Sequence, residues 1–64
     1  MAPSILQRLP VHWVGELLEH KHTKRKARVI AVYLSQVTLE EIGNPNAFVV
    51  NFRQVRHRYI EATP

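Results

Sequence analysis

The chain has 64 residues, of which 45% are hydrophobic, nine are Lys or Arg and five are Glu, so its formal net charge is +4. This length predicts one small domain over residues 1–64, with little room for a deep active-site cleft. The apolar content excludes a disordered or collagenous chain, and the absence of cysteine excludes disulfides, thiolate nucleophiles and cysteine-containing zinc sites.

The N-terminal third predicts short helical segments. A small apolar stripe over residues 5–9 ends before Pro10, because the residue that precedes a proline is biased away from the helical region. Over residues 10–20, apolar side chains recur at spacings of three and four, which is typical of an amphipathic helix. Trp13 in this segment is expected to be a core residue.

A second helix is expected over residues 24–36, with Val29 to Leu34 mostly buried. This run is rich in β-branched residues, so a buried strand is the alternative that periodicity alone does not exclude. The sequel favours a helix, because Thr38-Leu39-Glu40-Glu41 fits the capping-box pattern at the start of a further short helix. Gly43 suits a left-handed turn at the end of that helix.

The clearest periodic pattern is at the C-terminal end. After the turn Asn44-Pro45-Asn46, apolar residues recur at spacings of four, three and four, at Phe48, Phe52, Val55 and Tyr59. These spacings predict one last helix, with Pro45 in its first turn. The residues expected to point away from the core are Asn46, Val50, Arg53, Gln54 and His57, with Arg56 and Arg58 on the two flanks.

The predicted elements together give a fold class: an all-α domain of three to four helices with a helix-turn-helix in its C-terminal half. The predicted elements follow in the order expected of that motif: a helix, a short connection, a brief capped helix, a turn with Gly and Pro, and a final amphipathic helix.

Eight of the nine basic residues lie in two clusters, which indicates a surface that meets a polyanion. The first cluster is Lys21, Lys24, Arg25, Lys26 and Arg28, and the second is Arg53, Arg56 and Arg58. Arg, Gln and Asn side chains match the hydrogen-bonding edges of guanine and adenine, and an exposed Val suits a thymine methyl. We therefore expect the protein to bind double-stranded DNA with some sequence preference, as a transcriptional regulator or a phage or plasmid accessory factor. The candidate DNA-binding residues are Lys24, Arg25, Lys26, Arg28, Asn46, Val50, Arg53, Gln54, His57 and Arg58.

The stretch Ala31-x-Tyr33-Leu34-x-x-x-Thr38-Leu39-Glu40-Glu41-Ile42-Gly43 resembles the helix-turn-helix core of the C-terminal DNA-binding domain of the bacterial replication initiator DnaA. Its Thr-Leu-Glu-Glu-Ile piece is also similar to the second helix of a sigma-factor promoter-binding domain. The resemblance implies a tri-helical architecture and DNA binding. It implies no target site, because the Gly-Arg-Asp-His-Thr-Thr type of signature that makes the initiator's base contacts is missing after Gly43.

No enzymatic constellation is present in the sequence, and no cofactor is expected. Ser4 and Ser35 lack a surrounding motif, and the adjacent Glu40 and Glu41 would point in different directions on a helix. The pair His20 and His22 is not expected to hold a metal, because no Cys or Asp supplies a further ligand. A solvated basic surface remains the alternative for either cluster.

We expect a soluble cytoplasmic protein with no membrane partner. The longest apolar run, Val29 to Leu34, is far shorter than the roughly 20 residues needed to cross a bilayer, and the start of the chain lacks the charged region of a signal peptide. A homodimer that reads two half-sites fits the DNA-binding class. The alternative function is a small protein-interaction module that inhibits or adapts a host protein.

Overall fold

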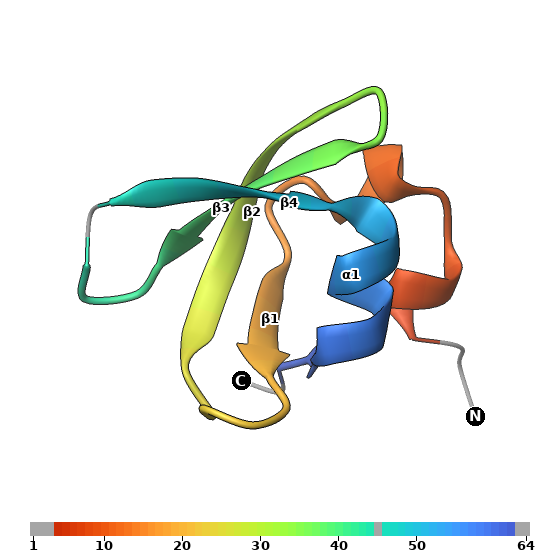
Figure 1. The fold of residues 1–64 in the computed structure, drawn as a ribbon. Coiled ribbons are helices and arrows are strands. Elements are labelled where there is room, and N and C mark those ends of the chain that lie inside the picture. The colour runs from red at the N-terminus through yellow and green to blue at the C-terminus, as the bar shows by residue number, and fades with distance from the viewer. Residues whose placement is uncertain (1–3, 45, 63–64) are drawn as a thin grey trace.

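The computed structural model describes residues 4–44 and 46–62. These residues form a five-stranded antiparallel sheet, one short α-helix and two 3-10 helices (Figure 1). In chain order the elements are η1 (Ile5–Gln7), η2 (Pro10–Trp13), β1 (Leu17–His20), β2 (Lys26–Tyr33), β3 (Gln36–Glu41), β4 (Ala47–Asn51), α1 (Phe52–Arg58) and β5 (Tyr59–Glu61). The expected all-α fold with a helix-turn-helix is therefore wrong.

The strand order β4-β3-β2-β1-β5 shows how the sheet is built. Strands β1 to β4 pair with their neighbours in sequence, whereas β5 returns to pair antiparallel with β1. Helix α1 carries the chain from β4 at one edge of the sheet to β5 at the other, and in Figure 1 it lies on the same side as η1 and η2. The end of α1 therefore comes next to the turn between β1 and β2.

Strand β2 replaces the helix expected over residues 24–36. Ala27 and Val29 are buried while their neighbours are exposed, which is the period of two of a strand with one covered face. A β-bulge between Val29 and Ala31 then shifts the register, so the next inward residue is Val32. The bulge puts successive core-facing residues three apart, and this spacing imitates a helix.

The burial expected for the run from Val29 to Leu34 is also wrong. Val29 is fully buried and Val32 is half-buried, but the remaining four residues are exposed.

Strand β3 replaces the capped helix expected at Thr38. Val37 and Leu39 are fully buried, and Thr38 between them lies opposite Ala31 of β2 and Val49 of β4. The capping-box pattern requires only that a Thr is followed three residues later by a Glu, and an alternating strand can contain that spacing as well. The Thr-Leu-Glu-Glu sequence therefore fits the pattern although no helix begins there. After the strand, Gly43 has φ +85°, which is the left-handed conformation expected of it.

The expected last helix is correct only for its second half. Residues 47–51 form β4, with Phe48 and Val50 packed against the core, and the helix begins at Phe52. The Asn51 side chain accepts a hydrogen bond from the backbone N–H of Arg53 at 2.9 Å and so caps the helix. Pro45, expected in the first turn of a longer helix, lies outside the described residues.

The core lies between the sheet, α1 and the N-terminal segments. Its fully buried side chains are Trp13, Leu18, Val29, Val37, Leu39 and Val55. The expected helix over residues 10–20 is replaced by η2 and β1, but the prediction that Trp13 is a core residue is confirmed. The indole Nε1 of Trp13 donates to the carbonyl oxygen of Ile5 at 2.9 Å, which fixes η1 beside η2. Among the described residues, no helix is long and apolar enough to span a membrane.

Candidate nucleic-acid interface

The outer face of α1 carries polar side chains in a compact group. At about 100° per residue, Arg53, Gln54 and His57 point away from the buried Val55, and all three are exposed. The core anchors one side of this short helix, while the other side offers a guanidinium, an amide and an imidazole to solvent. These groups can donate and accept hydrogen bonds at the edge of a base or a phosphate.

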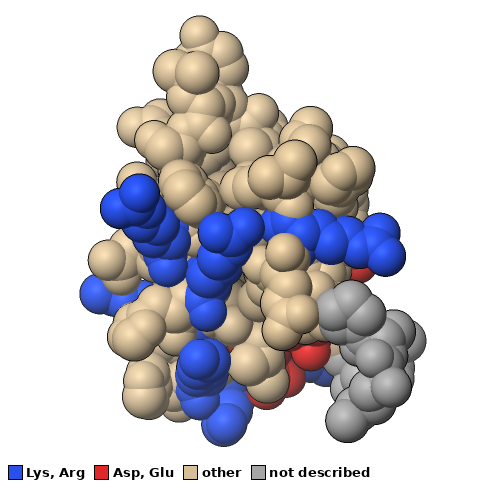
Figure 2. Space-filling model, turned by 90° about the vertical axis from the view of Figure 1, so that its right-hand side faces the viewer, with Lys and Arg blue, Asp and Glu red and all other residues tan. Residues whose placement is uncertain are grey.

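The two basic clusters of the sequence meet at the end of α1. The backbone N–H of Lys21, in the turn after β1, donates to the carbonyl oxygen of Arg58 at 2.8 Å. This contact continues the β1–β5 ladder, in which His20 lies opposite Tyr59. Figure 2 shows a band of Lys and Arg side chains across the face that carries α1 and the N-terminal segments, with only a few acidic atoms in view on its right and lower side.

Arg56 has a structural role within this face. Its Nε donates to the carbonyl oxygen of Leu6 at 3.0 Å, and its Nη2 donates to that of Arg8 at 3.1 Å. The guanidinium also lies over the rings of Trp13 and Phe52, at 5.4 and 5.3 Å from their centroids. Arg56 is exposed, but its hydrogen bonds and its contacts with the two rings connect α1 to the N-terminal segments.

The turn between β1 and β2 presents further cations. Lys24 is exposed and has φ 64°, and Nη1 of Arg25 lies 3.3 Å from Oε1 of Glu41. His20 organises the turn, because its Nδ1 accepts from the backbone N–H groups of His22 and Thr23. The positive charge of Arg25 is therefore partly compensated by Glu41. Lys24 lies in the same turn as Lys21.

Lys26 and Arg28 lie on the outer face of the sheet. Lys26 is opposite Glu19 of β1, and Arg28 is opposite Glu40 of β3. Opposite charges that face each other across neighbouring strands interact favourably, so these two cations are balanced locally. Nη1 of Arg28 also donates to the carbonyl oxygen of Gly15 at 2.7 Å.

Two predicted site residues are not part of the α1 face. Asn46 lies in the loop before β4, at the opposite end of that strand from α1, and its N–H donates to Oδ1 of Asn44. Val50, expected to be exposed on a helix, is half-buried on β4 and packs against the core. The expected exposure of Val50 on the outer side of a helix is therefore wrong.

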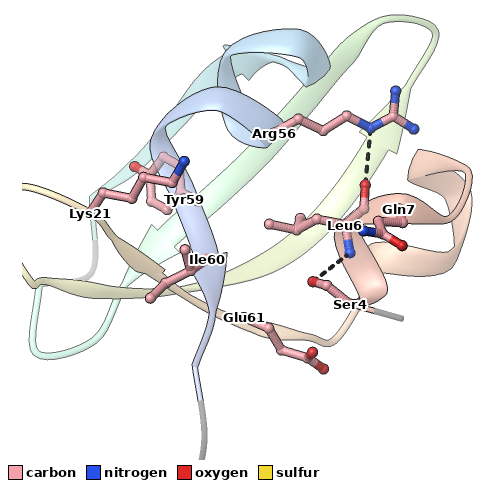
Figure 3. A pocket seen from close by; sticks show the side chains of 8 residues that line it. All are labelled: Ser4, Leu6, Gln7, Lys21, Arg56, Tyr59, Ile60 and Glu61. Carbon is pink, nitrogen blue, oxygen red and sulfur yellow. Dashed lines mark hydrogen bonds between the residues drawn. The ribbon is translucent and has the colours of Figure 1, made fainter. Parts of the chain in front are cut away.

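A groove runs beside the basic band, between η1 and β5 (Figure 3). Its volume is about 630 Å³, and it is lined by Ser4, Leu6, Gln7, Lys21, Arg56, Tyr59, Ile60 and Glu61. Burial raises the pKa of the Tyr59 phenol, the Glu41 carboxylate raises that pKa further, and Arg58 lowers it. The ring of His20 packs edge-on against Tyr59 at 5.0 Å between centroids. The phenol is thus a neutral group at the floor of a groove that has Lys21 and Arg56 in its walls.

Sequence reasoning left three exposed basic residues out of the candidate site, namely Arg56, described above, Lys21 and Arg8. Lys21 belongs to the first cluster but was not among the candidates, and only the return of β5 to β1 shows that it lies next to Arg58. Arg8 stands alone in the sequence, and the hydrogen bond from Arg56 to its carbonyl places it near α1. Spacing along the chain could not reveal either neighbour.

The described residues include no group of three or more His or Glu side chains placed to hold a metal ion. No family model, curated protein or solved structure matches this chain. The resemblance to the DnaA domain therefore stays untested by comparison, while the residues that carry it form the hairpin of β2 and β3.

Proposed function

We propose that the protein binds double-stranded DNA through the face formed by α1 and the turn between β1 and β2. The observation that carries the proposal is the backbone hydrogen bond between Lys21 and Arg58, which brings the two basic clusters of the sequence together at the end of α1. Phosphate neutralisation supplies most of the free energy of non-specific DNA binding, and a continuous band of cations is the surface that such binding needs.

The contacts divide by position. Lys21, Lys24 and Arg58 are exposed cations around the C-terminal end of α1, and they are assigned to phosphates. Arg53, Gln54 and His57 project from the outer side of the helix and are assigned to the groove, because Arg and Gln can pair with guanine and adenine edges. An α-helix with its side chains is about 10 to 12 Å across, which a major groove about 12 Å wide admits.

The dependence of affinity on salt tests this proposal. Fluorescence anisotropy with a labelled duplex gives the slope of log affinity against log salt for the parent protein, for Arg58→Gln and for Lys26→Gln. Each substitution removes one positive charge, but Lys26 faces Glu19 on the outer side of the sheet. Arg58→Gln should reduce the slope by up to about 0.9, the value for one lost phosphate contact, and Lys26→Gln should leave it unchanged.

Equal effects of the two substitutions would mean that only the net charge matters and that the α1 face is not the interface. An absence of duplex binding at near-physiological salt would reject the proposal outright.

A second candidate function is a protein-interaction module, and the N-terminal segments favour it. Leu9, Val11 and Val14 are 67%, 64% and 52% exposed within six residues, and exposed apolar side chains gathered in this way mark interaction surfaces. This candidate predicts one tight protein partner and no retention of duplex DNA, so the same anisotropy series separates the two functions.

A further inference from the structure

The hairpin between β2 and β3 ends in two large apolar side chains that contact little. Tyr33 is 74% exposed and Leu34 is 81% exposed, which makes Leu34 the most exposed of the large hydrophobic residues in the described chain. Figure 1 shows this hairpin projecting beyond the rest of the molecule, and its end is the uncharged prominence at the top of Figure 2. The tip of the β2–β3 hairpin therefore exposes two large, mainly apolar side chains to solvent.

The backbone at the tip is unfavourable for the residue that occupies it. Leu34 has φ 55°, the left-handed conformation that Gly, Asn and Asp adopt readily and that costs free energy for a residue with a branched side chain. A tight hairpin turn normally carries one of those residues. Leu34 thus adds backbone strain and exposed apolar area, and neither stabilises the fold.

The tip is tied to the start of α1, at the other end of the molecule from the turn between β1 and β2 (Figure 1). The carbonyl oxygen of Ser35 accepts a hydrogen bond from the backbone N–H of Phe52, the first residue of α1, at 2.9 Å. The next residue is Arg53, which is exposed on the outer side of that helix. Figure 2 shows the prominence and the band of Lys and Arg side chains on one face of the molecule.

We propose that Tyr33 and Leu34 form an apolar wedge that inserts at a base step of the bound duplex and unstacks it. The proposal rests on the function proposed above and adds the way in which the protein engages the DNA. Proteins that kink DNA insert apolar side chains between base pairs while neighbouring cations hold the phosphates, and the hairpin and the basic band supply these two parts. Flexible pyrimidine–purine steps are the preferred sites, because they unstack at the lowest cost.

An anionic bilayer is the other surface that attracts a basic face with an apolar tip. The duplex is favoured because the outer side of α1, the helix whose first residue is bonded to the tip, carries Gln54 and His57 as well as Arg53, and these offer paired donors and acceptors that suit base edges. A two-residue tip also buries little apolar area in lipid, whereas it matches the size of a gap between two base pairs.

The test uses a duplex with 2-aminopurine at a central TA step and a dye at one end, so that unstacking and affinity are read in the same sample. The parent protein should raise the 2-aminopurine fluorescence about threefold on saturation. Leu34→Gly should abolish most of that rise and weaken binding up to about tenfold. Because Gly relieves the strain at φ 55°, thermal unfolding should show that this variant is at least as stable as the parent protein.

Leu9→Ser is the matched control, since Leu9 is also an exposed leucine, at 67%, but lies before η2. It should leave the fluorescence rise unchanged. Binding of the duplex by the parent protein without any rise would overturn the wedge and keep the proposed function, whereas no binding would reject the proposed function itself. If Leu34→Gly instead abolishes sedimentation with phosphatidylserine-containing vesicles and leaves the duplex signal intact, the tip is a membrane anchor and the wedge is wrong.

Discussion

The guanidinium of Arg56 covers the buried indole of Trp13 at 5.4 Å from the ring centroid, and from that position it donates hydrogen bonds to the carbonyl oxygens of Leu6 and Arg8. Trp13 in turn donates to Ile5. The N-terminal segments, which add no strand to the sheet, are therefore fixed to α1 through one basic side chain and one aromatic ring.

Replacing Arg56 by Ala should destabilise the protein by about 2 kcal/mol, because it removes two charged hydrogen bonds and the contacts with two rings from a partly solvated site. Arg53→Ala removes the same type of side chain from the same helix and should change stability by less than about 0.5 kcal/mol. Urea unfolding followed by tryptophan fluorescence measures both values. Similar small effects would show that Arg56 does not hold the N-terminal segments.

Stability at alkaline pH should depend on Tyr59. Burial, together with Glu41, raises the pKa of Tyr59 above its ordinary value of 10.0, so the folded state favours the neutral phenol. The unfolded chain loses this proton first, and stability is therefore complete below pH 10.0 and falls as the pH rises through the pKa of the folded state.

This pKa can be observed alone in Tyr33→Phe, in which Tyr59 is the only remaining tyrosine. Its tyrosinate absorbance should appear above pH 10.0, and Glu41→Gln should move the transition to lower pH by removing the nearby carboxylate. A transition that does not respond to Glu41→Gln would contradict the assigned electrostatic cause.

The N-cap of α1 should contribute measurably to stability. Asn51→Ala removes the acceptor for the N–H of Arg53 and should cost about 1 kcal/mol. Asn51→Asp keeps an acceptor at the same place and should cost much less. Asn46→Ala provides a comparison in an exposed loop, and thermal unfolding of the three variants should rank Asn51→Ala as the least stable.

The outer face of α1 should determine any sequence preference. Gln54→Ala or Arg53→Ala should cost about 1 to 3 kcal/mol on a preferred duplex and little on random duplex, because a lost base contact removes discrimination. Lys21→Gln should weaken binding to both duplexes alike. Selection of bound duplexes from a random pool identifies the preferred sequence. Titration of the enriched and random sequences then gives the ratio of the two affinities. An unchanged ratio in Gln54→Ala and Arg53→Ala would exclude α1 as the reading element.

The predictable part of the fold was a few of its core residues and one half of its last helix. Trp13 and Val55 were expected inside, and Arg53 and Gln54 were expected on the outer side of a helix, since α1 preserves that local periodicity. The strands were missed because two local features imitate helical signals. The bulge after Val29 creates a spacing of three, and the apolar stripe from Phe48 to Tyr59 runs across a strand and then a helix, so no single period describes it.

The candidate site was predicted in composition but not in arrangement. The two basic clusters were visible in the sequence, yet their junction depends on the pairing of β5 with β1, which is a long-range contact that no local pattern encodes. Lys26 and Arg28 were expected to bind DNA, and the register places them opposite Glu19 and Glu40. Val50 was assigned to the outer face only because β4 was read as a helix.

The three-residue strand β5 also has a consequence for how the chain folds. Hairpins of β1 to β4 join residues that are close in sequence, but Leu18 meets Glu61 only after nearly the whole chain has been formed and ordered. Closing that long loop costs entropy before its contacts contribute, so this pairing raises the contact order and slows folding. Without β5 the edge of β1 would be exposed and the two basic clusters would lie apart, so the candidate interface depends on this one long-range pairing.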